Sequence, residues 1–404
     1  SSWLVSEGAA NKGTVQLSLA SDVAHAIQFS PYQSTGQSRT KTFVNVSSGD
    51  INADPSKFIS GRNGNTLNVT DNIADIATLQ GSMSSSSDRF LVKIYDGAAL
   101  KRSWARAKTT TPTPLWTIDA FKGYNYTSKD TTDLAVGDVN GDGYADIVTS
   151  IGGGDKTGII DVYSGANRKL LARLTPFADS KDKTSLNLAI GDVNADGYGD
   201  IVTGQGNGGS GCVEVFSGLN LSQQIKSSGG DVVTGLKASD MAKLFTDMFQ
   251  PYGSDYRGSV DVAAGYTLPR GYLANQVHQT PSANITTLKV GASGSTTDPT
   301  IRNFIYVGGD HGEGDHQSHS SAGHDTTPSS SVTYTSGYNT STRYSSLATQ
   351  YIDLPTGERG QSTILATTNS GRQDLLYLPD TSLQSGVMNT FDSTVFNWNP
   401  ASLG

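Results

Sequence analysis

Short runs of apolar and β-branched residues recur along the chain, and glycine, asparagine, aspartate or serine closes each run. The clearest unit reads LAVGD at 134–138, an acidic loop, IVTS at 147–150, a glycine-rich turn, DVYSG at 161–165 and a segment that ends in LTPF at 174–177. Short runs of this kind between turn residues are typical of β-strands. The pattern therefore predicts a unit of four short strands and an all-β fold.

This four-stranded unit is repeated. LAIGD at 188–192, IVTG at 201–204 and VEVFSG at 213–218 form a second copy 54 residues later, and weaker copies occur on both sides. One such unit cannot cover both of its faces, so several copies must stack around an axis. Repeated units of four short strands are typical of propeller blades. We therefore expect a single β-propeller domain over residues 1–404, with about six four-stranded blades.

One blade is expected to be split between the two ends of the chain. Its first strand is missing from the N-terminal region, and residues 395–398 are placed to supply it and close the ring. A subunit that lacks a strand can instead take one from a neighbour. Head-to-tail exchange that does not close builds a filament. The sequence leaves both outcomes open, and it places insertions at about 65–88, 222–245 and 308–330.

Composition and charge favour a turn-rich extracellular protein. The chain has 46 glycines, 16% charged residues and a net charge of −8, which argues against nucleic acid as a partner and suits cation-binding loops. The single cysteine, Cys212, excludes an internal disulfide and lies in a strand-like run where we expect it to be buried. No apolar run is long enough to span a membrane. A start at Ser1 without methionine would suit a processed, secreted protein.

Six Asn-X-Ser/Thr tripeptides are candidate glycosylation sites. Some will arise by chance in a chain rich in serine and threonine, but together they are compatible with a glycosylated extracellular surface. The asparagines are Asn45, Asn68, Asn125, Asn220, Asn284 and Asn339.

Two nine-residue loops carry the clearest candidate chemistry, DVNGDGYAD at 138–146 and DVNADGYGD at 192–200. Each has acidic or amide side chains at alternate positions, then a glycine, a tyrosine and a closing aspartate. Alternate side chains on a curled loop converge and offer oxygen ligands, which Ca²⁺ prefers. The glycine allows the positive φ of the turn. We expect two Ca²⁺ sites, with side-chain ligands and one tyrosine carbonyl in each, from Asp138, Asn140, Asp142, Tyr144 and Asp146 and from Asp192, Asn194, Asp196, Tyr198 and Asp200.

Aspartate, asparagine and glycine are also ordinary turn residues. Two copies with the same flanking strands favour the cation interpretation, and those strands distinguish the loops from an EF-hand, which needs flanking helices. A third loop begins at Asp50 and is degenerate. Pro55 replaces its glycine and Phe58 stands where the closing aspartate is expected, so we expect no cation there.

The pair GDVNGDGYADIVTS and GDVNADGYGDIVTG, with VYSG and VFSG downstream, resembles FG-GAP repeats of the integrin α-chain type. The resemblance is strong over about 116–220 and weaker over most of the remainder. It implies a β-propeller whose aspartate loops bind structural Ca²⁺ through the ligands named above. Integrin propellers have seven blades, so seven is the alternative to six. The family occurs in adhesion molecules and as extracellular accessory domains of bacterial surface proteins and enzymes, and thus implies location and fold better than activity.

Four of the six histidines lie in a glycine-rich segment at 308–325. With neighbouring acidic residues they are a candidate transition-metal site. Their spacing matches no zinc pattern, and a solvated insertion between strands is the simpler interpretation. The histidines are His311, His316, His319 and His324.

These observations predict a secreted or cell-surface structural or adhesive protein with calcium-stabilised propeller blades. If subunits exchange strands, it is a glycosylated subunit of an extracellular filament. Other copies of the chain, glycans and cell-surface ligands are the expected partners. No GxSxG, HExxH or P-loop motif is present, and we assign no catalytic residue. The alternative is an extracellular carbohydrate-binding protein, or a polysaccharide-active hydrolase or lyase, on the same scaffold.

Overall fold

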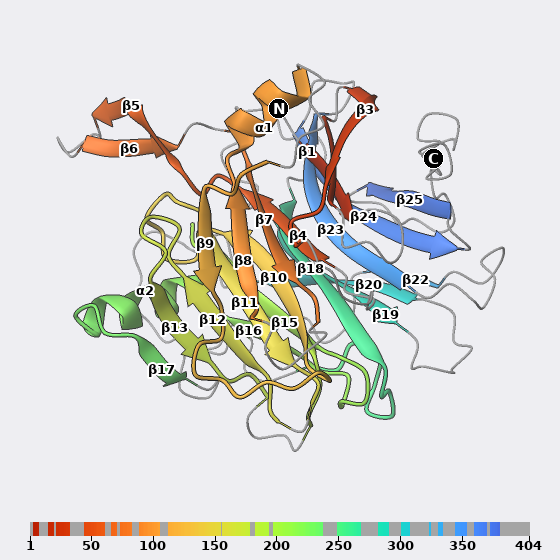
Figure 1. The fold of residues 1–404 in the computed structure, drawn as a ribbon. Coiled ribbons are helices and arrows are strands. Elements are labelled where there is room, and N and C mark those ends of the chain that lie inside the picture. The colour runs from red at the N-terminus through yellow and green to blue at the C-terminus, as the bar shows by residue number, and fades with distance from the viewer. Residues whose placement is uncertain are drawn as a thin grey trace, which may run out of the picture. The chain divides into compact units, whose positions relative to one another are not determined.

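In the computed structural model, the regular structure of the described residues consists almost entirely of β-strands (Figure 1). The sheets are mostly antiparallel, which confirms the expected all-β class. Two helices occur in the described residues, and neither is long and apolar enough to cross a membrane. The structure describes residues 3–7, 15–19, 22–32, 44–60, 66–70, 73–82, 89–105, 112–154, 156–177, 182–193, 197–236, 249–267, 282–290, 300–307, 323–324, 330–333, 344–353, 359–369 and 372–379.

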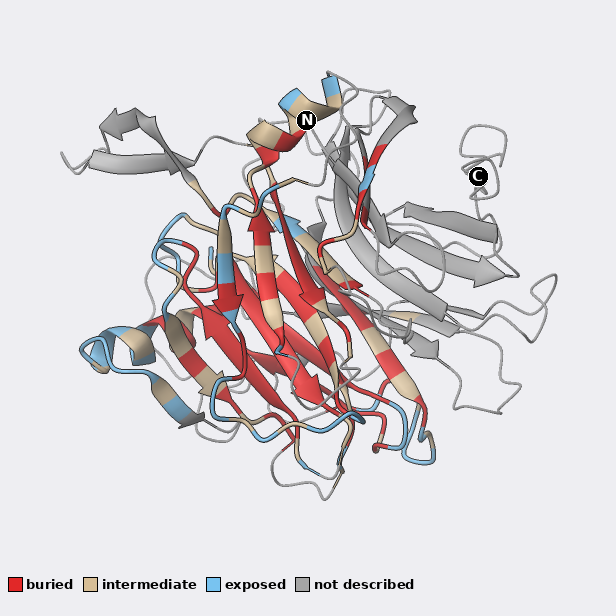
Figure 2. Ribbon diagram, in the orientation of Figure 1, coloured by how far each residue is buried: buried red, intermediate tan, exposed pale blue. Residues whose placement is uncertain are grey.

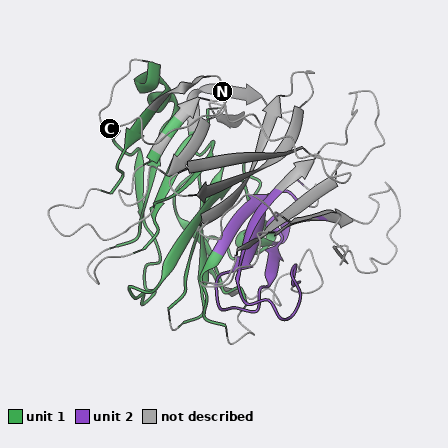
Figure 3. Cartoon of the chain, turned by 90° about the vertical axis from the view of Figure 1, so that its right-hand side faces the viewer, with its two compact units in different colours: residues 1–186, 221–237 green, residues 187–220, 238–404 purple. Residues whose placement is uncertain are grey.

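The chain divides into two compact units (Figure 3). The first comprises residues 1–186 and 221–237, and the second comprises residues 187–220 and 238–404. The acidic loop at 138–146 therefore belongs to the first unit and the loop at 192–200 to the second.

Two sheets of the first unit have consecutive strands that pair antiparallel with their neighbours, as the repeat predicts. One contains β4 (Val44–Gly49), β7 (Asp75–Gln80), β8 (Leu91–Tyr95) and β9 (Trp116–Asp119), and helix α1 (Gly97–Ala105) follows β8. The other contains β10 (Thr131–Gly137), β11 (Asp146–Gly152), β12 (Ile159–Tyr163), β13 (Leu170–Leu174) and, parallel to β13, β17 (Val233–Leu236). A three-stranded sheet contains β1 (Trp3–Glu7), β2 (Val15–Leu19) and β3 (Asp22–Phe29).

The second unit has three sheets. The first contains β14 (Leu186–Gly191), β15 (Asp200–Gln205) and β16 (Val213–Phe216), and helix α2 (Gly218–Ser227) follows β16. The second contains β18 (Ser259–Thr267), β19 (Ser282–Val290), β20 (Thr300–Val307), β21 (Gly323–His324) and β22 (Ser330–Thr333). The third contains β23 (Tyr344–Asp353), β24 (Arg359–Asn369) and β25 (Arg372–Pro379). Cys212, just before β16, is buried as expected.

The insertion expected at about 65–88 lies elsewhere, because β7 falls in that range and pairs with β4 and β8. The segment that interrupts this sheet is a hairpin of β5 (Ala53–Ser60) and β6 (Thr66–Thr70). Phe58 lies in the hairpin, so the prediction that it takes the place of the closing aspartate is wrong. Asp75, the first residue of β7, holds that place. The error arose because Phe58-Ile-Ser-Gly has the same short apolar pattern as a blade strand.

Two other sequence predictions fall largely on residues that the structure does not describe. The segment 222–245 includes the end of α2 and strand β17, and its residues after 236 lie outside the described part. Most of 308–330, and all of 395–398, also lie outside it.

The inner strands are buried along their whole length (Figure 2). Every residue of β11, β12, β15 and β16 is buried, whereas the edge strand β9 alternates between buried and exposed positions. A strand covered on both faces carries a continuous apolar run, and a strand covered on one face alternates. This burial explains the runs IVTS and VEVF, which made the repeat visible in the sequence.

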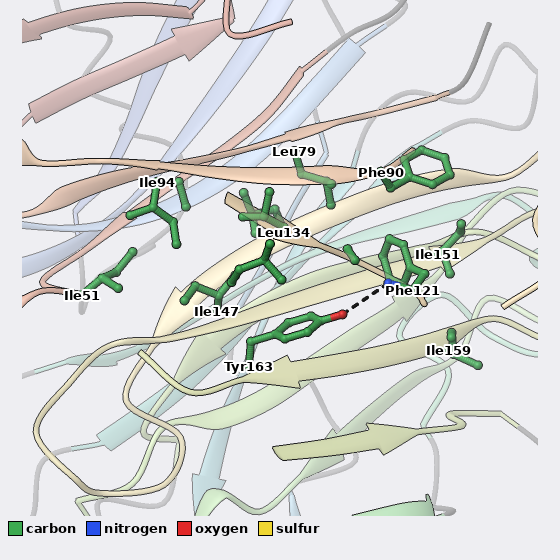
Figure 4. Packing of buried hydrophobic residues seen from close by; sticks show 14 residues of the cluster. Ile51, Leu79, Phe90, Ile94, Phe121, Leu134, Ile147, Ile151, Ile159 and Tyr163 are labelled. Atoms are coloured by element: carbon green, nitrogen blue, oxygen red, sulfur yellow. Dashed lines mark hydrogen bonds between the residues drawn. The ribbon is translucent and has the colours of Figure 1, made fainter. Parts of the chain in front are cut away.

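A hydrophobic cluster joins the β4–β9 and β10–β13 sheets within the first unit (Figure 4). Ile147 and Phe121 are fully buried in it, and the Tyr163 hydroxyl accepts a 3.2 Å hydrogen bond from the Phe121 N–H. Phe121 has a φ of 57°, and Phe177, at the same point of the next repeat, has a φ of 54°. Left-handed backbone at a bulky residue is unfavourable by itself, so burial of both rings must hold these turns. The recurring Phe-ending segments of the sequence thus correspond to buried corners.

An ion pair with a fully buried aspartate links β13 to β12. Arg173 donates from Nε and Nη2 to the two carboxylate oxygens of Asp161, at 2.6 and 2.7 Å, and Asp161 is fully buried. The Tyr163 hydroxyl donates to the same carboxylate. Arg89 and Asp119 form a contrasting pair, in which both side chains are largely exposed.

Replacing Arg173 by Met should lower the unfolding free energy by about 3–5 kcal/mol, because it leaves a buried carboxylate without its cation. Replacing Arg89 by Met, the matched control, should cost no more than about 1 kcal/mol, since exposed pairs contribute little. Urea unfolding of the two variants at one pH measures both effects. Equal, small losses would show that Asp161 does not depend on Arg173.

Candidate calcium-binding loops

The first acidic loop connects β10 to β11 and is folded by hydrogen bonds to its own aspartates. Asp138 accepts from the N–H groups of Gly141 and Gly143, at 2.7 and 2.9 Å, and Asp142 accepts from Tyr144 N–H at 2.9 Å. Gly143 has a φ of 87°, which confirms that this position needs left-handed backbone. These hydrogen bonds hold the backbone of the loop in a curled conformation.

The closing aspartate, Asp146, is the fixed point of this loop. Its side chain is fully buried, and its Oδ2 accepts from Val139 and Asn140 N–H groups at 3.1 and 3.2 Å. Its Oδ1 accepts from the N–H of Gly165, at 2.9 Å, at the end of the VYSG motif. One carboxylate therefore joins the start of the loop, the strand β11 and the chain after β12.

The second loop, between β14 and β15, has the same connections. Asp200 is fully buried and accepts from the N–H groups of Val193 and Gly218, at 2.8 and 3.0 Å. Gly197 has a φ of 88°, as predicted, and its N–H donates to Asp192 at 2.9 Å. Asn194 and Asp196, two of the predicted ligands, lie outside the described residues.

Asp75 is a third buried aspartate of this kind, and it was not predicted from the sequence. It is fully buried, and its Oδ2 accepts from the N–H groups of Ile51 and Asn52, both at 2.9 Å. Its Oδ1 accepts from Gly97 N–H at 2.9 Å and from Asn52 Nδ2 at 3.0 Å. A signal for it was available, since DIAT at 75–78 matches DIVT at 146–149 and at 200–203. We call Asp75, Asp146 and Asp200 the latch aspartates.

The third strand of each repeat is followed by a Ser-Gly or Asp-Gly pair. For Gly97 and Gly165, the structure shows why the second residue of the pair is glycine. A Cβ on Gly97 would lie 2.1 Å from the carbonyl oxygen of Ala74, and one on Gly165 would lie 2.1 Å from that of Ala145. Each alanine directly precedes a latch aspartate. The two backbones therefore approach so closely that no side chain fits between them.

Burial is the largest influence on the charge of these carboxyls. It raises the pKa of Asp146 to about 8, where the Gly165 hydrogen bond acts in the opposite direction and the charges of Asp142 and Asp138 raise it further. Burial also raises the pKa of Asp138. The three carboxyls of the first loop therefore repel one another when ionised, and a bound cation would relieve this repulsion.

The donor set of the first loop suits a hard cation, because every candidate group is an oxygen. Even so, among the residues described, no three His, Cys, Asp or Glu side chains are gathered as a metal ion would require. As placed, Asp138 and Asp142 accept hydrogen bonds from the loop backbone. The calcium ligands therefore stay a prediction.

The other predicted sites are less fully described. His311, His316 and His319 lie outside the described residues, and His324 is in β21. Among the candidate glycosylation sites, Asn45 donates its Nδ2 to the Thr132 carbonyl at 2.6 Å, whereas Asn125 is exposed. Asn220 is half-buried in α2, Asn68 and Asn284 are in β6 and β19, and Asn339 lies outside the described part.

The arrangement of strand, acidic loop and latch aspartate also occurs in a known family of repeats. Residues 131–165, from β10 to Gly165, match the FG-GAP repeat. The resemblance inferred from the sequence is therefore confirmed for the first loop and its flanking strands.

No curated protein matches the sequence. Among solved structures, the chain is similar to rhamnogalacturonan lyase YesW, with a TM-score of 0.30 and 13% identity. The match covers 92% of this chain and 66% of the lyase, so the chain spans less than two thirds of the length of that protein. At this TM-score and identity, the likeness says nothing about activity.

Replacing Gly165 by Ala should lower the unfolding free energy by about 3 kcal/mol or more, because the new Cβ forces backbone apart and weakens the bond to buried Asp146. Gly143 to Ala is the control. Nothing lies within 4 Å of a Cβ there, so only the left-handed backbone opposes it, at about 1–2 kcal/mol. Chemical unfolding in EGTA measures both without a contribution from calcium. A larger loss for the Gly143 variant would contradict the close approach at Gly165.

Replacing Asp75 by Asn should have an effect that depends on pH. Burial raises the pKa of Asp75 from 3.8 to about 6. The folded chain therefore binds this proton more tightly than the unfolded chain, and the resulting stability is full below pH 3.8 and lost as the pH rises through about 6. The difference of 2.2 between these values corresponds to about 3 kcal/mol.

Asparagine does not titrate, so the stability lost in the Asp75→Asn variant should shrink by up to about 3 kcal/mol between about pH 4 and pH 7. Urea unfolding of both proteins across this range measures the difference. A loss that grows with pH would instead show that the hydrogen bonds accepted by the ionised carboxylate outweigh its burial.

Proposed function

We propose that this chain is a structural or adhesive protein of the cell surface or extracellular space, and that calcium in its two acidic loops stabilises FG-GAP blades of a β-propeller. The observation that carries the proposal is the FG-GAP repeat at 131–165, in which the charges of Asp138 and Asp142 act on the fully buried latch aspartate Asp146. The repeated strand order of the β4–β9 and β10–β13 sheets supports the blade arrangement.

Calcium would act on stability and not on chemistry. A cation bound to Asp138, Asn140, Asp142, Asp146 and the Tyr144 carbonyl would offset the mutual repulsion of the carboxylates. Only the folded loop offers these groups together, so the ion would bind the folded state alone and shift the folding equilibrium. The second loop, with Asp192, Asn194, Asp196, Tyr198 and Asp200, would act in the same way.

Calcium titration tests this proposal. At a hundredfold excess over the dissociation constant, each site should raise the unfolding free energy by about 2.7 kcal/mol. Asp142→Asn should remove one of two sites, as counted by isothermal calorimetry, and Asp231→Asn, an exposed aspartate outside the loops, should leave both. An unfolding midpoint that EGTA does not change would remove calcium from the proposed function.

We further propose that subunits self-associate by strand exchange, with N-glycans on the exposed surface. The three-stranded β1–β2–β3 sheet supports this: β1, β2 and β3 match the second, third and fourth strands of the repeat, and in the described residues β1 pairs with β2 alone. The first strand of that sheet would come from residues 395–398, of the same chain or of a neighbour.

Deleting residues 395–404 distinguishes the two sources. With exchange between subunits, the full chain forms filaments in electron micrographs and the shortened chain stays monomeric. Sedimentation of both chains over a range of concentrations gives an independent reading. A full chain that remains monomeric at high concentration, and loses stability on the deletion, would show that each subunit closes its own ring.

A further inference from the structure

Five basic side chains near β12 and β13 form no ion pair in the part of the chain that the structure describes. Four are exposed and Arg168 is half-buried. The whole chain has a net charge of −8, so a group of basic residues is a local departure from its overall charge. The five residues, named here the basic stripe, are Lys122, Lys129, Lys156, Arg168 and Lys169.

The basic stripe follows the segment 116–130 across the sheet. At one end the Arg168 guanidinium lies 4.3 Å from the centre of the Trp116 ring. At the other end Lys156 lies 5.5 Å from the centre of the Tyr124 ring and donates to the Asn125 carbonyl at 2.6 Å. Cation–π contacts of this kind restrain the two cations in place.

The two ends of the stripe are separated by the length of a strand. Arg168 lies in the turn after β12 and Lys156 in the turn before it. The five residues of β12 span roughly 17 Å. Lys122 lies between the ends, since its carbonyl accepts from Arg173 Nη2 at 3.3 Å. The cations are therefore spread along a strip, which suits an extended polyanion better than a small anion.

The acidic groups beside the stripe are already engaged. Asp161 is fully buried and paired with Arg173, and Asp130 is buried and accepts from the N–H groups of Thr127 and Gly154. Asp119 is paired with Arg89. Asp155 lies outside the described residues. The described surroundings thus leave the stripe with an excess of positive charge.

We propose that the basic stripe binds an acidic polysaccharide through carboxylates spaced along the sugar chain. Single-stranded nucleic acid is disfavoured because base stacking needs open aromatic faces, and Trp116 and Tyr124 each already have a cation over the ring. A membrane surface is disfavoured because Leu115 and Val232 are the large apolar side chains exposed in the described residues, too few for an inserting patch. This inference extends the proposed adhesive function, on which it rests, by naming a ligand class.

The experiment measures the affinity of the full chain for polygalacturonate at low salt. It compares two triple variants, each of which removes three positive charges. The stripe residues chosen are exposed and their side chains form no hydrogen bond in the described part, so folding should be unaffected; circular dichroism and unfolding midpoints check this. The stripe variant is Lys122→Gln, Lys129→Gln and Lys169→Gln. The control variant, with exposed cations elsewhere, is Arg102→Gln, Lys226→Gln and Arg257→Gln.

The unaltered chain should bind polygalacturonate, more weakly as NaCl is added, and should bind neutral dextran far less. The stripe variant should bind roughly tenfold more weakly, and the control variant should bind as the unaltered chain does. Equal weakening of the two variants, or no binding by the unaltered chain, would overturn the proposal. Tighter binding of single-stranded DNA than of polygalacturonate would overturn the choice of ligand.

All measurements are made in EGTA and repeated in calcium. EGTA prevents calcium from bridging carboxylates of the polymer to the acidic loops, so binding in EGTA reports the stripe. Failure of the proposed calcium function appears as an unfolding midpoint that EGTA leaves unchanged. Failure of the stripe proposal appears as absent or non-selective polymer binding in a folded chain, so the two outcomes are distinguishable.

Discussion

A buried carboxylate that accepts hydrogen bonds from two distant stretches of backbone is the interaction on which each repeat depends. Asp75, Asp146 and Asp200 begin the second strand of their sheets, and each binds N–H groups of the preceding loop and of a glycine after the third strand. These hydrogen bonds satisfy carboxyl oxygens that water does not reach, and an unmade hydrogen bond in the interior is costly. The loop, the inner strand and the exit from the third strand are therefore fixed together.

This latch sets which positions can vary. Gly97 and Gly165, which donate to Asp75 and Asp146, cannot carry a side chain, because the carbonyl of the alanine before the aspartate lies where the Cβ would be. The inner strands are covered on both faces, so their residues must be apolar or, like Asp161, have buried polar partners. The residues between the first strand and the aspartate are less constrained. Between Asn52 and Asp75 the chain inserts a whole hairpin, and the latch still forms.

Features set by neighbouring residues could be predicted from the sequence, whereas features set by distant contacts could not. The strand order of the β10–β13 sheet, the burial of Cys212 and the positive φ of Gly143 and Gly197 follow from local patterns, which depend on neighbours in the chain. Asp75 was missed because the β5–β6 hairpin separates it from Asp50, and the apolar run at Phe58 imitates the strand that Asp75 begins. The basic stripe was missed for a related reason. Lysine and arginine at 122, 156 and 168 have no pattern in sequence, and only the crossing of segment 116–130 over the sheet relates them.

A latch that needs only the two ends of a loop also explains how the residues between those ends can vary without loss of the fold. Lengthening a loop costs little free energy, since closure entropy grows only slowly with length. In the Asp75 repeat, the Asn52 side-chain amide donates to the latch carboxylate at 3.0 Å and supplies partial positive charge beside it. In the first acidic loop, the charges of Asp142 and Asp138 raise the pKa of the latch aspartate, and Asn140 donates to Asp142 at 3.1 Å. The first arrangement is satisfied by the chain alone, whereas the second places acidic side chains close enough to raise the pKa of Asp146, which is the arrangement on which the proposed calcium site rests.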